Sequence, residues 1–266
     1  MIASWERGGY DVRQYLSGWF WLSDGWYWLD TSNQDIPVSH PDFVESFGLS
    51  QDSASDMALY LDYYVGRIWF DLMEIVIPVL EPLPELFVAW VTAGSWNCWV
   101  EKVQAWWLQQ DQESALDELV SDNLNIAKRW WNARHLDMGY LSAGPSIWFW
   151  RTGGIVTLEW DTRACFVSGV LCWVESNGRQ TFSVSEFKRE VSGFRDRLAA
   201  DMRDRILEVE ALNLLSQTQV EDLWRQHEKS LSQEGRWEGA DWAEIHAAVL
   251  QLEILSGISM EQCKPI

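Results

Sequence analysis

Strand-like and helix-like segments are kept apart along this chain, and this separation constrains its fold more than any other feature. Residues 146–184 hold four runs of β-branched and aromatic residues, punctuated by Gly153-Gly154 and Asn177-Gly178. Because Asn-Gly is the strongest short signal for a hairpin turn, we predict four successive antiparallel strands. Helical patterns occupy the sequence before and after them. Together they indicate an α+β fold, in which an antiparallel meander sheet packs against several long amphipathic helices.

Two helices are predicted before the strands. Apolar residues recur at steps of three and four over residues 61–76, which predicts a helix that Ser55 or Asp56 can cap. Pro78 is expected to kink or end it. Residues 112–133 predict a second helix, with acidic residues first and basic residues last, an order that suits the helix dipole.

The C-terminal part of the chain is predicted to be helical. A long helix is expected after the cap Ser185, and a shorter one over residues 218–233. A final helix should open at Asp241 and end at Gly257. The apolar stripe of the long helix consists of Phe187, Val191, Phe194, Leu198, Met202, Ile206 and Val209.

Residues 15–30 are predicted as two aromatic strands joined by a tight turn at Ser23-Asp24-Gly25, since Asp-Gly readily adopts the positive φ of such turns. At 266 residues and 47% hydrophobic, the chain can bury a substantial core. We expect one domain over residues 1–266. Its parts are an acidic Trp-rich N-terminal half (14–127), the sheet (146–184) and the C-terminal helices (185–257).

The acidic Trp-rich half has an unusual charge. It carries 18 Asp and Glu but only two basic residues, Arg67 and Lys102, so its net charge is −16 out of −20 for the chain. It also holds ten of the 20 tryptophans. This charge argues against nucleic acid and against an anionic membrane surface, because both are bound through Lys and Arg. A basic protein, attracted at long range, is the expected class of partner.

Two sets of residues are predicted to contact that partner. Carboxylates would steer it, and tryptophans would anchor it, because Trp is enriched among the residues that dominate interface energetics. The four tryptophans chosen are so closely spaced that one helix could not point all of them inward. The steering residues are Asp52, Asp56, Asp111, Glu113, Asp117 and Glu118, and the anchors are Trp96, Trp99, Trp106 and Trp107.

No motif for catalysis, phosphate binding or metal binding is present, so we expect no cofactor and no metal. The sequence has no G-x-S-x-G elbow, no HExxH pair and no EF-hand run of aspartates. An enzyme with Asp24, Asp137 or His135 in a tryptophan-lined pocket stays an alternative. A self-associating adaptor is a third reading, and the oligomeric state is open.

The chain begins without the apolar segment of a signal peptide and contains no run of 18 apolar residues. Its four cysteines, Cys98, Cys165, Cys172 and Cys263, form no CxxC and no short metal-binding spacing. They are therefore expected to be reduced, buried thiols. These features predict a cytoplasmic protein.

Residues 19–28 read WFWLSDGWYW, and further distinctive segments follow at 61–72, 134–141, 148–151 and 182–191. In this order they resemble an uncharacterised bacterial family, carried as a domain of unknown function, whose members open with a W-F-G-L-T-D-G-W-Y-W-like signature. That family is similar in size and character to bacterial immunity proteins, which protect a cell from its own or a neighbour's toxin. The resemblance implies a protein that neutralises a basic toxin by occluding its active surface.

Overall fold

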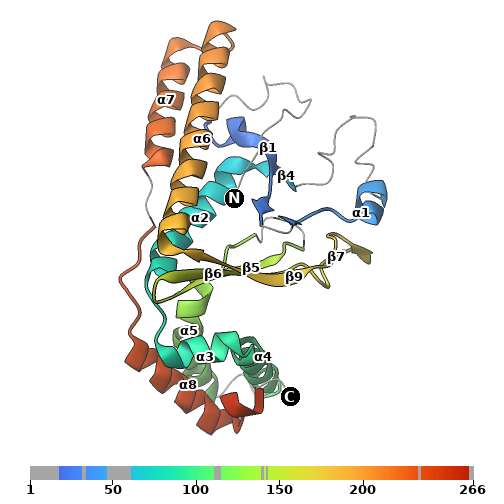
Figure 1. The fold of residues 1–266 in the computed structure, drawn as a ribbon, viewed down its shortest axis with the longest axis vertical. Coiled ribbons are helices and arrows are strands. Elements are labelled where there is room, and N and C mark those ends of the chain that lie inside the picture. Colours follow the sequence, from blue (N-terminus) through green and yellow to red (C-terminus); the bar gives the residue numbers. More distant parts are fainter. Residues whose placement is uncertain are drawn as a thin grey trace.

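The computed structural model places helices on both sides of a three-stranded antiparallel sheet, which confirms the predicted α+β class (Figure 1). It describes residues 18–31, 34–46, 61–110, 115–138, 141, 143–232 and 235–263.

The sheet consists of β5 (Ser146–Thr152), β6 (Ile155–Asp161) and β9 (Asn177–Ser183), in that order. Thr152 pairs with Ile155, so Gly153 and Gly154 form the predicted two-residue turn. Side chains alternate along β5. Ile147 and Phe149 enter one hydrophobic cluster, whereas Trp150 enters a second, so the sheet separates two cores.

The second predicted turn is wrong in position. The turn lies at Ser168-Gly169, where both φ angles are positive, between β7 (Phe166–Val167) and β8 (Val170–Leu171). Asn177-Gly178 instead begins β9. Gly178 lies opposite Trp160, and a Cβ on it would come within 2.6 Å of the indole. The glycine is therefore required by close packing in the sheet and not by a turn.

The predicted N-terminal hairpin does not form among the described residues 18–30. Residues Trp21–Ser23 form a short 3-10 helix, η2, and β1 (Asp24–Tyr27) pairs with β4 (Leu61–Tyr64), far along the chain. The Oγ of Ser23 accepts a hydrogen bond from Gly66 N at 2.9 Å, which fixes this pairing. The connection between them contains β2 (Leu29–Asp30), β3 (Asp35–Ile36) and α1 (Pro41–Ser46).

The helix predicted over residues 61–76 begins later, because its first residues belong to β4. It is α2 (Val65–Leu80), and it contains Pro78 and ends two residues after it. Its proposed caps, Ser55 and Asp56, lie outside the described residues. The helices that follow are α3 (Glu85–Thr92), α4 (Ser95–Trp107) and α5 (Ala115–Asn132), the last within the predicted range 112–133.

The C-terminal helices follow the predicted pattern. All seven stripe residues of α6 (Val184–Ala211) are buried, but Ser183 and not Ser185 caps it, in a capping box with Glu186. The next helix is α7 (Gln217–Leu231). The last, α8 (Trp242–Ser256), is capped by Asp241 and ends at Gly257 in the left-handed conformation, as predicted. A 3-10 turn, η4 (Met260–Cys263), follows.

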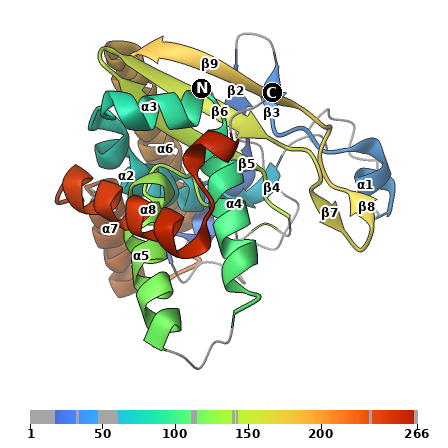
Figure 2. The ribbon, with the colours of Figure 1, turned by 90° about the horizontal axis from the view of Figure 1, so that it is seen from below.

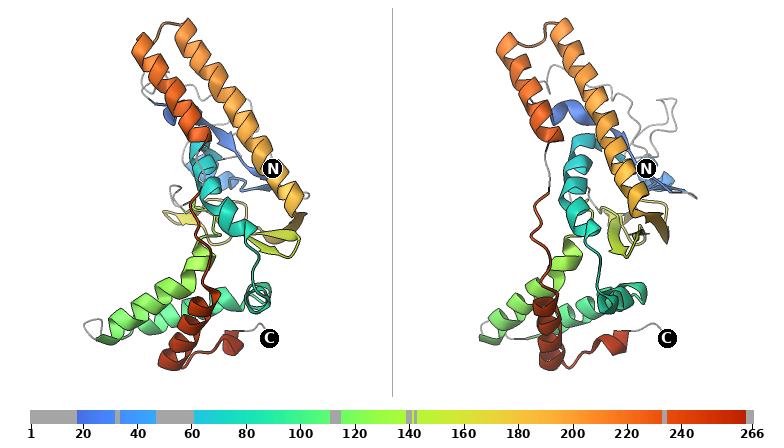
Figure 3. Two further views of the ribbon diagram at one scale, coloured as in Figure 1. Left: turned by 90° about the vertical axis from the view of Figure 1, so that its left-hand side faces the viewer. Right: turned by 60° about the vertical axis from the view of Figure 1, so that its left-hand side comes forward.

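Two hydrophobic clusters lie on opposite sides of the sheet. The first joins α2, α6 and β6, and the second joins α3, α4, α5 and α8 (Figures 1 and 2). An extended segment, residues 235–241, leaves the α6–α7 pair and runs beside α2 to reach α8 (Figure 3). We call this segment the strap. It joins the helices of one cluster to those of the other.

Asp71 on α2 makes stability depend on pH. Its side chain is 3% exposed, and Arg67 Nε donates a hydrogen bond to it at 3.2 Å. Burial raises the pKa of Asp71 to about 7 against the opposing charge of Arg67, and Asp137 and Glu74 raise it further. The folded state therefore binds a proton between pH 4 and pH 7 that the unfolded chain has released.

Stability should accordingly fall as pH rises from 4 to 7, with a contribution of up to about 1.4 kcal/mol per pH unit from Asp71. We expect Asp71→Asn to flatten this slope in urea unfolding measured at pH 5, 6 and 7. Glu85→Gln is the control, because Glu85 is exposed on α3 and is not among the charges that shift the pKa of Asp71. An unchanged slope in Asp71→Asn would contradict the assignment.

Candidate binding cleft

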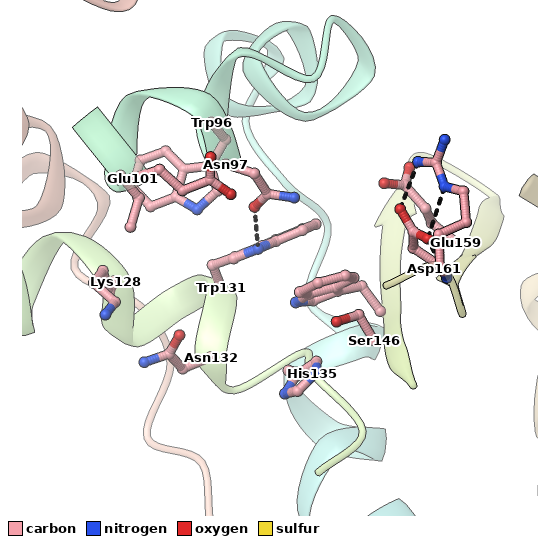
Figure 4. A pocket seen from close by; sticks show the side chains of 13 residues that line it. Trp96, Asn97, Glu101, Lys128, Trp131, Asn132, His135, Ser146, Glu159 and Asp161 are labelled. Atoms are coloured by element: carbon pink, nitrogen blue, oxygen red, sulfur yellow. Dashed lines mark hydrogen bonds and ion pairs between the residues drawn. The ribbon is translucent and has the colours of Figure 1, made fainter. Parts of the chain in front are cut away.

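A cleft of about 480 Å³ opens between α4, the end of α5, and strands β5 and β6 (Figure 4). Its floor and walls combine indole rings with amide, hydroxyl and charged side chains. This mixture of apolar surface with a few converging polar groups is typical of ligand sites. The lining residues are Trp96, Asn97, Val100, Glu101, Lys128, Trp131, Asn132, His135, Ser146, Trp148, Glu159, Asp161 and Arg163.

Three neighbouring aromatic rings, two of them stacked, form one wall of the cleft. The rings of Trp131 and Trp148 are nearly parallel, with centroids 5.7 Å apart, and the ring of His135 lies 4.7 Å from Trp148. Asn97 fixes Trp131 by accepting a hydrogen bond from its Nε1 at 3.1 Å (Figure 4). Residues of α4, α5 and β5 therefore fix this wall in place.

The backbone places His135 opposite Trp148. Phe149 N donates to Arg134 O and Leu136 N donates to Ile147 O, each at 2.9 Å, so the residues after α5 pair with the edge of β5. This pairing satisfies backbone groups that an exposed sheet edge would leave open. The imidazole is therefore presented to the cleft by a rigid element.

The imidazole of His135 has an unused hydrogen-bonding atom. Its Nε2 is buried and has no partner among the described residues, although a buried polar atom normally has one. Burial lowers the pKa of His135, and the nearby charge of Asp137 opposes this shift. At neutral pH the ring is therefore mainly uncharged.

Charged residues on the strand side of the cleft are paired with each other. Asp161 Oδ2 accepts from Arg163 Nη2 at 2.6 Å, and this hydrogen bond lowers the pKa of Asp161. Glu159 is paired with Arg179, whose guanidinium also lies 5.5 Å from the ring centroid of Trp150. Negative charge on this side is thus largely compensated within the protein.

The structure corrects two of the predicted surface anchors. Trp96 and Trp99 are 1% and 0% exposed. The reason is that α4 is enclosed on more than one side: α8 and the C-terminal turn pack against it, and Trp99 Nε1 donates to Ile258 O at 3.1 Å. Trp106 and Trp107 are half-buried and remain accessible in part.

The predicted steering residues are described only in part. Glu118 is exposed on α5, and Asp117 is half-buried, accepting a hydrogen bond from Trp107 Nε1 at 2.6 Å. The other four lie outside the described residues: Asp52, Asp56, Asp111 and Glu113.

Of the residues proposed for an enzyme, the cleft brings in only His135. Asp137 is exposed and does not line the cleft, and the side chain of Asp24 is outside what the structure describes. Sequence reasoning missed the polar lining residues Asn97, Asn132 and Ser146. They come from three separate elements, so no local spacing signals their proximity.

Within the described ranges, no group of three or more His, Cys, Asp or Glu side chains could hold a metal ion. None of the helices described is both long and apolar enough to cross a membrane.

The fold and the cleft define an α+β protein with a tryptophan-walled pocket beside helices α4 and α5. The chain belongs to DUF5984, a family of unknown function whose model matches residues 2–248. This match confirms the expectation that the chain belongs to a domain-of-unknown-function family. Searches of curated proteins and of solved structures returned no match.

Proposed function

We propose that this chain is a binding protein of the immunity type, which neutralises a basic toxin domain by covering its active surface. The observation that carries the proposal is the end of the α4–α5 pair, where exposed leucines stand beside carboxylates. Leu108 is 68% exposed, and Leu116 and Leu119 are 38% and 43% exposed. Glu118 and Asp122 are exposed on the same helix. We call this surface the α4–α5 tip.

The α4–α5 tip has the composition of a protein-binding surface. Interfaces combine an apolar centre with a polar rim, and the hydrogen bond from Trp107 to Asp117 holds the two helices together here. The carboxylates would attract a basic partner during encounter, and the leucines with Trp106 and Trp107 would be covered in the complex. The tip lies at the end of α4 and α5 that points away from the sheet (Figure 2).

The test begins with affinity capture of the tagged chain from its native cell lysate at low salt, followed by a salt gradient and mass spectrometry. A basic protein eluting at defined salt would then be purified for kinetics. We expect Glu118→Lys with Asp122→Lys to slow association at least about tenfold at low salt and to flatten its salt dependence. Asp117, also a predicted steering residue, is left unchanged because its reversal would free Trp107.

The matched control is Glu210→Lys with Glu221→Lys. Both residues are exposed, Glu210 near the C-terminal end of α6 and Glu221 near the N-terminal end of α7. This end of the α6–α7 pair lies opposite to α4 and α5 (Figure 1), and the change in net charge is the same. Association rates that do not vary with salt, or that fall equally in both double variants, would refute steering by the α4–α5 tip.

The cleft supports a second candidate, a site for a small molecule and with it the enzyme alternative. Its volume suits a ligand of ordinary metabolite size, and its stacked wall suits a planar ring. The polar side chains of Asn97, Asn132 and Ser146, which line the cleft, would bond a polar edge of that ring.

This candidate is tested with a set of small heteroaromatic fragments observed by saturation-transfer NMR. Fragments that bind the wild-type chain are expected to lose binding in Asn132→Trp, which fills the mouth of the cleft. Asn125→Trp is the control, because Asn125 is exposed on the same helix but does not line the cleft. Binding that persists in Asn132→Trp would place the fragments elsewhere.

A further inference from the structure

Two of the four cysteines face each other across a hairpin. Cys165 and Cys172 directly flank β7 and β8, in which Phe166 pairs with Leu171. Cys172 N donates to Cys165 O at 2.8 Å, so the two cysteines lie opposite each other at the end of the ladder and make one of the two hydrogen bonds of a hydrogen-bonded pair. In such a pair the two side chains leave the same face, and the Cα atoms are about 5.5 Å apart. That separation lies at the centre of the range found for disulfides.

The two thiols differ in accessibility. Cys165 is half-buried, whereas Cys172 is fully buried, and both are reduced in the structure. Burial raises the pKa of both thiols, and the neighbouring Cys172 raises that of Cys165 further. An oxidant from solution therefore meets Cys165 first, while Cys172 is held next to it as a second thiol.

We propose that Cys165 and Cys172 form a reversible intramolecular disulfide when the chain meets a small disulfide oxidant such as oxidised glutathione. The Cys165 thiolate attacks the oxidant, forms a mixed disulfide and releases one reduced glutathione. The Cys172 thiolate then attacks the sulfur of Cys165 and releases the second. One disulfide of the oxidant is reduced, one disulfide of the protein is formed, and the two thiol protons pass to the departing thiolates.

The bond would act on more than the hairpin. Cys172 O accepts from His40 N at 2.9 Å, and Val174 N donates to Val38 O at 2.8 Å, so the end of β8 continues into contacts with the segment before α1. Oxidation would fix the β7–β8 hairpin at the point where it holds that segment. The disulfide would therefore form in response to oxidation at the place where the hairpin contacts the segment before α1.

Trypsin provides a direct readout. It cuts after Arg163 and Arg179 and leaves both cysteines in one peptide, 164–179. The native full-length chain is equilibrated with mixtures of oxidised and reduced glutathione, alkylated, digested and weighed. We expect this peptide to lose two hydrogen atoms and to take up no alkylating agent, and to recover both thiols after treatment with dithiothreitol.

Two variants check the order of the steps. Cys172→Ser should stop at the mixed disulfide, with glutathione on Cys165, and Cys165→Ser should leave Cys172 as a free thiol. The same chain, unfolded in guanidinium chloride, is the reference, because it shows how readily the disulfide forms without the hairpin. The proposal is overturned if the native peptide keeps two thiols, or retains glutathione, at a redox poise that already oxidises the unfolded chain.

The other two cysteines do not interfere with this measurement. Cys98 on α4 and Cys263 on η4 also interact, and burial together with this contact raises the pKa of Cys263 to about 11. They fall in different tryptic peptides, so their state does not affect the mass of peptide 164–179.

Discussion

Replacing Glu81 by glutamine is expected to lower the free energy of unfolding by about 3–5 kcal/mol, because it leaves a buried arginine without its counter-charge. Arg134 is 0% exposed, and its guanidinium lies 3.8 Å from the Glu81 carboxylate. It also donates to Trp130 O at 2.7 Å. Burial already lowers the pKa of Arg134 to about 10, and the Glu81 carboxylate opposes that shift.

Glu81 also attaches the strap. Its carboxylate accepts hydrogen bonds from Trp242 Nε1 at 3.0 Å, from Ala240 N at 3.3 Å and from Trp237 Nε1. Both indoles lie against Arg134: its guanidinium carbon is 5.8 Å from the ring centroid of Trp237 and 5.6 Å from that of Trp242. One carboxylate therefore joins the end of α2, the end of α5 and the strap.

Urea unfolding followed by circular dichroism measures this effect. Glu85→Gln, exposed on α3, is the control and should change stability by less than about 0.5 kcal/mol. Glu81→Gln combined with Arg134→Met should regain part of the loss, because the unpaired buried charge is gone. If Glu81→Gln alone lowers the free energy of unfolding by less than about 1 kcal/mol, Arg134 must find solvent or another acceptor.

Trp130→Ala is expected to cost about 3–5 kcal/mol, as for other large aromatic residues removed from a core. Trp130 is 0% exposed and touches the rings of Phe87, Trp96 and Trp131, with centroids 5.1, 4.9 and 5.3 Å away. Its Nε1 has no hydrogen-bond partner among the described residues. Trp130→Phe should therefore lose much less, since it keeps a ring in place and breaks no hydrogen bond.

The same variant tests the expectation of a single domain. Trp130 belongs to the cluster of α3, α4, α5 and α8, and the other cluster lies across the sheet. If residues 1–266 unfold as one unit, Trp130→Ala should move a single transition, seen alike by tryptophan fluorescence and by circular dichroism. Two separated transitions would show two units that unfold independently.

Helices could be read from the sequence because their signal is local. The stripe of α6 recurs at seven positions from Phe187 to Val209, and the cap and stop of α8 are carried by Asp241 and Gly257 themselves. The turn at Gly153-Gly154 was equally local. Asn177-Gly178 carried the same kind of signal and was misleading, because packing against Trp160 required its glycine.

The candidate site was much less predictable. Of the residues lining the cleft, the sequence pointed to His135 for an enzyme site and to Trp96 as a surface anchor, a role that its burial rules out. The stacked wall depends on the pairing of residues 134–136 with β5, which no short pattern announces. Spacing and charge select Trp106, Trp107, Asp117 and Glu118, which lie at the α4–α5 tip, and their role in binding stays a prediction.

By itself, the sequence determined the α+β class, the positions of most helices and the acidic character of the N-terminal half, because periodicity and composition are properties of neighbouring residues. Only the tertiary structure decided that β1 pairs with β4, that Trp96 and Trp99 are buried, and that Cys165 faces Cys172. These outcomes depend on which surfaces meet when the chain folds. The same tryptophan can lie in a core or at an interface, and only the packing of other elements around it distinguishes the two.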